Sequence, residues 1–149
     1  MSDWFTLRWD GGEVVLLDQR ELPTEEKYLR LRTVEEVAQA IESMVVRGAP
    51  AIGCTAAMGI ALAVTRSPAE DPAALEESLA ADFDRLAKTR PTAVNLFWAL
   101  DRMRGVLRSA TAEPGATLAT VRSRLVEEAE TILVEDVETC RDIGQVGLS

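Results

Sequence analysis

Two arginines stand beside prolines at points where one helical pattern ends and the next begins. Arg47 is followed by Gly-Ala and then Pro50, and Arg90 directly precedes Pro91. A proline suits the first turn of a helix, where free N–H groups attract anions, and a guanidinium offers forked donors that match a phosphate. Such a corner could therefore bind an oxyanion. The alternative is a structural salt bridge, which the stretch around Arg47 alone favours because it lacks the spacing of a Walker or dinucleotide motif.

Apolar periodicity predicts the helices on either side of the first corner. Thr33 and Glu36 have the spacing of a capping box, and the stripe behind them ends at Gly48, a residue suited to the left-handed turn that closes a helix. The next helix, from Pro50 to Thr65, is apolar nearly all round and belongs in a core. The stripe of the first helix comprises Val34, Val37, Ala38, Ile41, Met44 and Val45.

Three more helices are predicted after residue 66. One begins at Asp71-Pro72, one follows the Arg90 corner with Thr92 as its cap, and a long one runs from Thr117 to Gly144, about 40 Å at 1.5 Å per residue. Their apolar faces comprise Leu75, Leu79, Phe83 and Leu86; Leu96, Phe97, Leu100, Met103 and Leu107; and a run from Leu118 to Ile143.

The N-terminal part reads as β-structure. Residues 4–9 alternate, Asp10-Gly11-Gly12 supplies a turn, and residues 14–17 and 28–32 are further strand-like runs. The predicted fold class is mainly α: a helical bundle of about five helices with a small N-terminal antiparallel β-sheet. The expected domains are the sheet at 1–32 and the helical bundle at 33–149.

Two polar side chains lie close to predicted apolar faces. Asn95 follows the second corner by one turn, and Asp136 lies beside the stripe of the last helix. A carboxylate in such a position needs a partner if it is buried. We expect Asn95 to make a capping or inter-helix hydrogen bond, and Asp136 to form a structural salt bridge or helix contact rather than act as a catalytic acid.

The composition excludes several classes of function. The net charge is −9 with no histidine and no basic run, which argues against a nucleic-acid partner and removes the commonest metal ligand. Cys54 and Cys140 are expected to be reduced thiols, and no signal peptide is recognised at the start. The apolar segment 49–64 is too short to span a bilayer comfortably. We therefore expect a cytoplasmic protein with no membrane partner, no metal and no cofactor.

Three ordered stretches carry a family resemblance. They are V-R-G-A-P-A-I-G at 46–53 with A-A-M-G at 56–59, L-L-D-Q-R-E-L-P at 16–23, and T-R-P-T-A-V-N-L at 89–96. Together they resemble the methylthioribose-1-phosphate isomerase family, and the D-Q-x-x-L-P element points to that branch of a superfamily that also holds ribose-1,5-bisphosphate isomerases and regulatory subunits of a translation-initiation exchange factor.

The resemblance implies an aldose-ketose isomerase of methionine salvage that converts 5-methylthioribose 1-phosphate to 5-methylthioribulose 1-phosphate, without metal or organic cofactor, as a homodimer. By residue matching, Arg47, Gly48, Ala49 and Arg90 would bind the phosphorylated sugar. The family's catalytic cysteine follows the I-G-x-x-G-L segment, here 143–148, and its aspartate lies in a Rossmann-like half. Both are expected beyond Ser149, so the chain alone should be inactive. The alternative is a non-catalytic regulatory module that senses a sugar phosphate or nucleotide.

Overall fold

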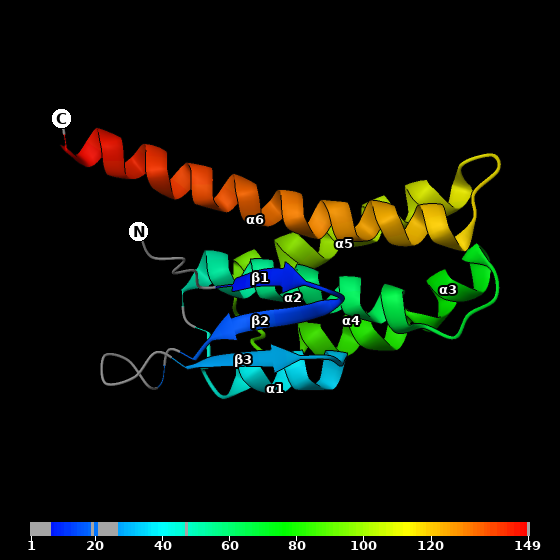
Figure 1. Ribbon diagram of the computed structural model, residues 1–149, viewed down its shortest axis with the longest axis horizontal. Coiled ribbons are helices and arrows are strands. Elements are labelled where there is room, and N and C mark those ends of the chain that lie inside the picture. The colour runs from blue at the N-terminus through cyan, green and yellow to red at the C-terminus, as the bar shows by residue number, and fades with distance from the viewer. Residues whose placement is uncertain (1–6, 19, 21–26, 47, 149) are drawn as a thin grey trace.

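A computed structural model of the protein describes residues 7–18, 20, 27–46 and 48–148, with side chains described as far as Asp136. Three strands precede a set of helices (Figure 1). The described elements are β1 (Leu7–Asp10), β2 (Glu13–Leu17), β3 (Tyr28–Leu31), α1 (Val34–Glu42), α2 (Ala49–Arg66), α3 (Pro72–Ser78), α4 (Ala80–Ala87), α5 (Val94–Ala112) and α6 (Leu118–Leu148).

The strands form an antiparallel sheet in the order β1-β2-β3, as predicted. Gly11 and Gly12 have positive φ angles of 59° and 82°, which only glycine adopts easily, and they turn β1 into β2. Alternate side chains along the strands point to one face of the sheet, and this face packs on the helices. Its core residues are Leu7, Val14, Leu16 and Leu31. Residues 4–6 of the first predicted strand lie outside the described residues.

Helix α2 is the centre of the fold. It packs against α1, α4, α5, α6 and the sheet, and in Figure 1 strands β1 and β2 lie in front of it while α6 runs above it. Its length and apolar composition would also suit a membrane span, but 67% of that window is buried inside the fold. This is the behaviour expected of a core helix with no polar face.

The first helix is shorter than predicted. The Thr33–Glu36 capping box is confirmed, but α1 ends at Glu42, and the left-handed residue that closes it is Met44, with φ 65°. The N–H groups of Met44 and Val45 bond the carbonyls of Ile41 and Ala40, which is the Schellman pattern. Met44 is consequently exposed rather than part of the buried stripe, and Gly48 begins α2 instead of ending α1.

Three details of the later helices also differ from expectation. The predicted third helix is divided into α3 and α4 at Leu79, although its apolar face is buried throughout. Helix α5 is capped at Ala93, not Thr92, because a turn closes from the N–H of Ala93 to the carbonyl of Arg90. Phe97 is 38% exposed and leaves the core stripe, which Ala99 and Ala110 complete instead.

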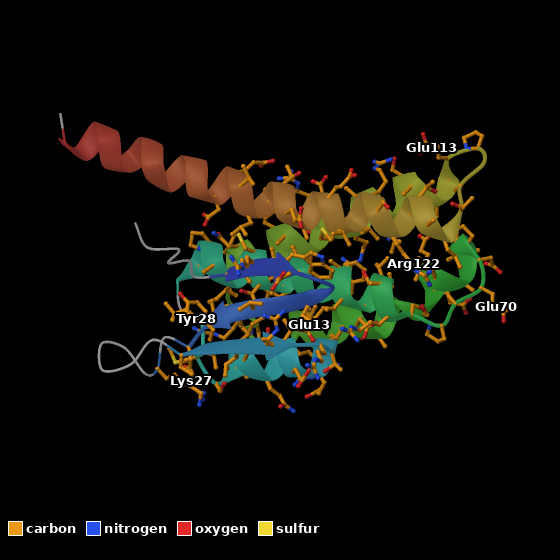
Figure 2. The ribbon with its side chains drawn as sticks, viewed as in Figure 1. Glu13, Lys27, Tyr28, Glu70, Glu113 and Arg122 are labelled. Carbon is orange, nitrogen blue, oxygen red and sulfur yellow. The ribbon has the colours of Figure 1, made fainter. Side chains whose placement is uncertain are left out.

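Helix α6 is continuous, as predicted, and extends over 31 residues, or roughly 46 Å at 1.5 Å per residue. Figure 1 shows its C-terminal end projecting beyond the other elements. Near its start, Arg122 faces the rest of the fold (Figure 2) and donates from Nε and Nη2 to the carbonyls of Val64 and Ser67, each at 3.0 Å. This arginine therefore satisfies carbonyl groups at the C-terminal end of α2.

Candidate functional site

The first predicted corner opens α2. Arg47 lies outside the described residues. Gly48 is the N-cap residue with φ 92°, and Ala49 is the first helical residue; both are exposed. No described side chain caps this end, and the first turn carries no acidic residue. As far as the described residues show, the first N–H groups of α2 are therefore available to an anionic group.

The second predicted corner joins α4 to α5. Arg90 is half-buried in the turn that its carbonyl makes with the N–H of Ala93 at 2.9 Å. Among the residues that the structure describes, its guanidinium makes no hydrogen bond and no ion pair. No described residue therefore forms the structural salt bridge that was the alternative for Arg90.

The two helices that begin at these corners meet near their starts. A methyl group added at Gly53 would come within 2.8 Å of the backbone carbonyl oxygen of Asn95. Gly53 lies five residues after Gly48, or roughly 7.5 Å along the helix axis, and Asn95 lies five residues after Arg90. A residue without a side chain at position 53 thus lets the start of α5 approach the start of α2.

A pocket of about 340 Å³ lies where α2 and α5 meet α6. This volume falls in the range of roughly 300–1,000 Å³ that is usual for small-molecule sites. Its wall combines apolar surface, one aromatic ring, one amide and two carboxylates. The described lining residues are Pro50, Gly53, Cys54, Asn95, Trp98, Ile132, Glu135 and Asp136.

An arginine network stands at the edge of this pocket. Arg102 on α5 donates to Glu135 from Nη1 at 2.8 Å and from Nη2 at 2.7 Å, and it also pairs with Glu128. Its guanidinium lies 5.4 Å from the centroid of the Trp98 ring. These hydrogen bonds hold the pKa of Glu135 below its ordinary value and raise the pKa of Arg102. Both carboxylate oxygens of Glu135 therefore accept a hydrogen bond from Arg102, and Trp98 lies between this arginine and the pocket.

The two polar residues expected to be structural lack the partners that were expected. Asp136 makes no ion pair or hydrogen bond with any described residue, and burial raises the pKa of its carboxyl. The Asn95 side chain likewise makes no hydrogen bond within the described ranges. The predicted hydrogen bond of Asn95 and salt bridge of Asp136 are therefore not found among the described residues, and both side chains line the pocket.

Cys54 is buried in α2, and its Sγ lies 3.9 Å from the carbonyl oxygen of Ile132. The side chain of Cys140 lies outside the described part. The roles of Gly53, Trp98 and Glu135 in the pocket were missed from the sequence. Gly53 could have been noticed because it belongs to the A-I-G element, and Trp98 because tryptophan is rare in this sequence. Glu135 could not, because the contact of α6 with α2 and α5 depends on tertiary packing.

Comparison with known proteins places the chain in a family. The pattern of the initiation factor 2 subunit family matches residues 45–149. The chain belongs to this family. Among its relatives, the methylthioribose-1-phosphate isomerase of Geobacillus thermodenitrificans is 45% identical over 97% of this chain and 39% of its own length. That of Thioalkalivibrio sulfidiphilus is 49% identical over 93% of this chain and 38% of its own length.

Solved structures of the same family agree. The 5-methylthioribose 1-phosphate isomerase of Pyrococcus horikoshii superposes with a TM-score of 0.83 at 41% identity, over 89% of this chain and 36% of that one. The translation initiation factor eIF-2B subunit delta of A. fulgidus gives 0.79 at 41% identity, over 89% and 37%. The resemblance seen in the sequence is confirmed, and the chain spans about two fifths of the length of the curated relatives that it matches.

Proposed function

We propose that this chain is the substrate-binding part of an aldose-ketose isomerase that converts 5-methylthioribose 1-phosphate to 5-methylthioribulose 1-phosphate in methionine salvage. Relatives named methylthioribose-1-phosphate isomerase support this type of reaction. The observation that supports the binding role is Arg90, a half-buried residue in the turn before α5 whose guanidinium has no partner among the described residues.

In the proposed binding mode, the N-terminus of α2 and the two arginines bind the phosphate of the substrate. The phosphate would accept hydrogen bonds from the open N–H groups at Gly48 and Ala49, where the dipole of α2 also favours negative charge. Arg90 would supply a forked pair of donors, and Arg47 would supply a second guanidinium. Because Gly48 has no side chain, the phosphate could approach the backbone closely.

The isomerisation itself needs an acid-base pair in a site closed to water, whether hydrogen moves as a proton through an enediol or as a hydride. We assign no catalytic residue in this chain. In our proposal those groups belong to a longer protein, in keeping with the share of its relatives that the chain spans, and the 149-residue chain alone is inactive. We further propose that the longer protein is a cytoplasmic homodimer that uses no metal or cofactor and binds no nucleic acid or membrane.

Replacement of Arg90 tests this function. In the 149-residue chain, Arg90→Gln is expected to weaken binding of 5-methylthioribose 1-phosphate by about tenfold, because a charge-assisted pair of hydrogen bonds is lost. Isothermal titration calorimetry measures this, and Arg124→Gln, an exposed arginine whose ion pair to Glu113 is 3.6 Å long, is the matched control. In a longer protein that contains the chain, replacing Arg47 or Arg90 should raise KM or lower kcat by a similar factor. Unchanged binding and kinetics would refute the proposal.

A second candidate is a non-catalytic module that senses a sugar phosphate or nucleotide. The similarity to the translation initiation factor eIF-2B subunit delta of A. fulgidus favours it. Both candidates predict ligand binding, so the discriminating measurement is turnover of 5-methylthioribose 1-phosphate by a longer protein that contains this chain. Turnover supports the isomerase, and tight binding without turnover supports the sensing module.

A further inference from the structure

Asp136 differs from the neighbouring acidic residues of α6. Glu128 and Glu135 both pair with Arg102, so each of these carboxylates has a cationic partner within the protein. Asp136 is half-buried, lines the pocket between α2, α5 and α6, and has no partner among the described residues. Asn95 reaches the same pocket from α5, also with no side-chain hydrogen bond in that part of the chain.

Partial burial of an unpaired carboxylate costs free energy. Removing an ionised group from water without a compensating hydrogen bond costs free energy, and the raised pKa of Asp136 reflects that cost. A group that lines a cleft and has a perturbed pKa is a candidate for contact with a ligand. The same loss of water around Asp136 would be compensated if a bound molecule donated hydrogen bonds to it.

We propose that Asp136 is a substrate-contacting residue that accepts hydrogen bonds from the hydroxyl groups of a sugar bound in this pocket, with Asn95 as a second polar contact. This inference rests on the proposed function and specifies which part of the substrate lies beside α6. The phosphate would lie at the start of α2 and beside Arg90, and the hydroxyl-bearing carbons would extend into the pocket.

The chemistry of the described wall selects hydroxyl groups over other ligands. Two carboxylates repel a phosphate, whereas a carboxylate can accept from two hydroxyls at once and an amide can both donate and accept. Trp98 and Ile132 offer apolar surface to the carbon side of a sugar. A metal ion is not favoured, since no group of three or more acidic, cysteine or histidine side chains with suitable geometry occurs among the described residues.

The binding test uses the 149-residue chain and 5-methylthioribose 1-phosphate in isothermal titration calorimetry. Asp136→Ala should weaken binding by about tenfold, and Asp136→Asn by a smaller factor because the amide retains one acceptor. Glu130→Gln removes an exposed carboxylate from the same helix and should leave the affinity within about twofold of the unmodified chain. Equal binding by the unmodified chain and Asp136→Ala would overturn the inference.

A second titration, with inorganic phosphate, distinguishes a failure of this inference from a failure of the proposed function on which it rests. Inorganic phosphate should bind equally well or better to Asp136→Ala, because a nearby negative charge is removed, and more weakly to Arg90→Gln. If the phosphorylated sugar binds and depends on Arg90 but not on Asp136, the inference fails while the proposed function stands. If the unmodified chain does not bind the phosphorylated sugar, both fail.

A stability measurement separates ligand contact from a structural role. Because Asp136 has no described partner to lose and its charge is partly desolvated, Asp136→Asn should leave the thermal unfolding midpoint unchanged or raise it. A structural carboxylate would give the opposite result. Weaker sugar binding together with an undiminished midpoint supports the inference, whereas a midpoint lowered by several degrees at Asp136→Asn would overturn it.

Discussion

Gly53 is the residue at which a single methyl group would disturb the site most directly. Its Cβ would meet the carbonyl oxygen of Asn95 at 2.8 Å, and a backbone oxygen cannot rotate away as a side chain can. We expect Gly53→Ala to lower the free energy of unfolding by roughly 1–3 kcal/mol, since the strain of overpacking exceeds the gain in helix propensity. Urea unfolding followed by circular dichroism measures the change.

Gly105 provides the matched control for that substitution. It lies in the interior of α5 and is exposed, and a Cβ there would meet nothing within 4 Å. Gly105→Ala should therefore raise the free energy of unfolding by roughly 0.5–1 kcal/mol. The two changes are chemically identical and are expected to have opposite signs. If Gly53→Ala also stabilises the chain, α5 does not approach α2 as closely as described.

Asp18 gives a pH prediction. Its side chain is fully buried and accepts hydrogen bonds from the N–H of Arg20 and from Nε and Nη2 of the same residue at 2.8–3.0 Å. The Arg20 side chain in particular lowers the pKa of Asp18, so its contribution to stability is fully present above the unfolded pKa near 3.9 and is lost as pH falls through the folded value. Asp18→Asn should be less stable at pH 7, by a margin that narrows towards pH 3. Parallel stability curves for the two proteins across that range would contradict the assignment.

At this scale, part of the candidate site follows from residue type and order. Ala49 begins α2 beside Pro50, and Arg90 lies in the turn before α5, close to where the proline and arginine pattern predicts new helices, because proline acts through local backbone conformation; Gly48 caps α2 instead of closing the helix before it. The sequence does not show that the side chains of Asn95 and Asp136 lack hydrogen-bond partners among the described residues. Whether a polar side chain has a partner depends on which helix passes opposite, and that is decided by packing between distant segments.

The end of α2 depends on a side chain from another element. Arg122 of α6 donates to two carbonyls near the C-terminus of α2, where the helix dipole also favours a positive charge. We expect Arg122→Ala to lower the free energy of unfolding by roughly 1–3 kcal/mol, as for hydrogen bonds that involve a charged group. Denaturant unfolding at constant ionic strength gives the value. Arg124→Ala on the same helix removes one long, exposed ion pair and should cost less than about 0.5 kcal/mol; equal losses would show that Arg122 has no capping role.

The elements themselves were largely predictable, and their ends were not. Capping chemistry located the start of α1 at Thr33 and of α3 at Asp71, where side-chain oxygens accept from Glu36 and Ala74. The end of α1 was misplaced because Met44 adopts the left-handed conformation that glycine usually supplies. Local propensity favours Gly48 for that role, but the chain turns four residues earlier so that Val45 and Val46 can enter the core.

For the whole molecule, exposed apolar residues gather on one face of α5. Val94, Phe97 and Trp98 are 77%, 38% and 53% exposed, and their three- and four-residue spacing places them side by side on the helix. Such a group of apolar side chains on a protein surface favours association. The net charge of −9 opposes it through repulsion between copies.

We expect the 149-residue chain to self-associate reversibly, more strongly in high salt because screening weakens the repulsion between its acidic surfaces. Phe97→Glu places a charge in the middle of the apolar group and should shift the equilibrium towards monomer. Ala80→Glu adds the same charge at an exposed position on α4 and should change association much less. Sedimentation velocity over a range of protein and salt concentrations measures both effects. A monomer at every concentration would refute the predicted self-association. Equal effects of the two substitutions would show that only net charge matters and that the apolar face of α5 is not the contact.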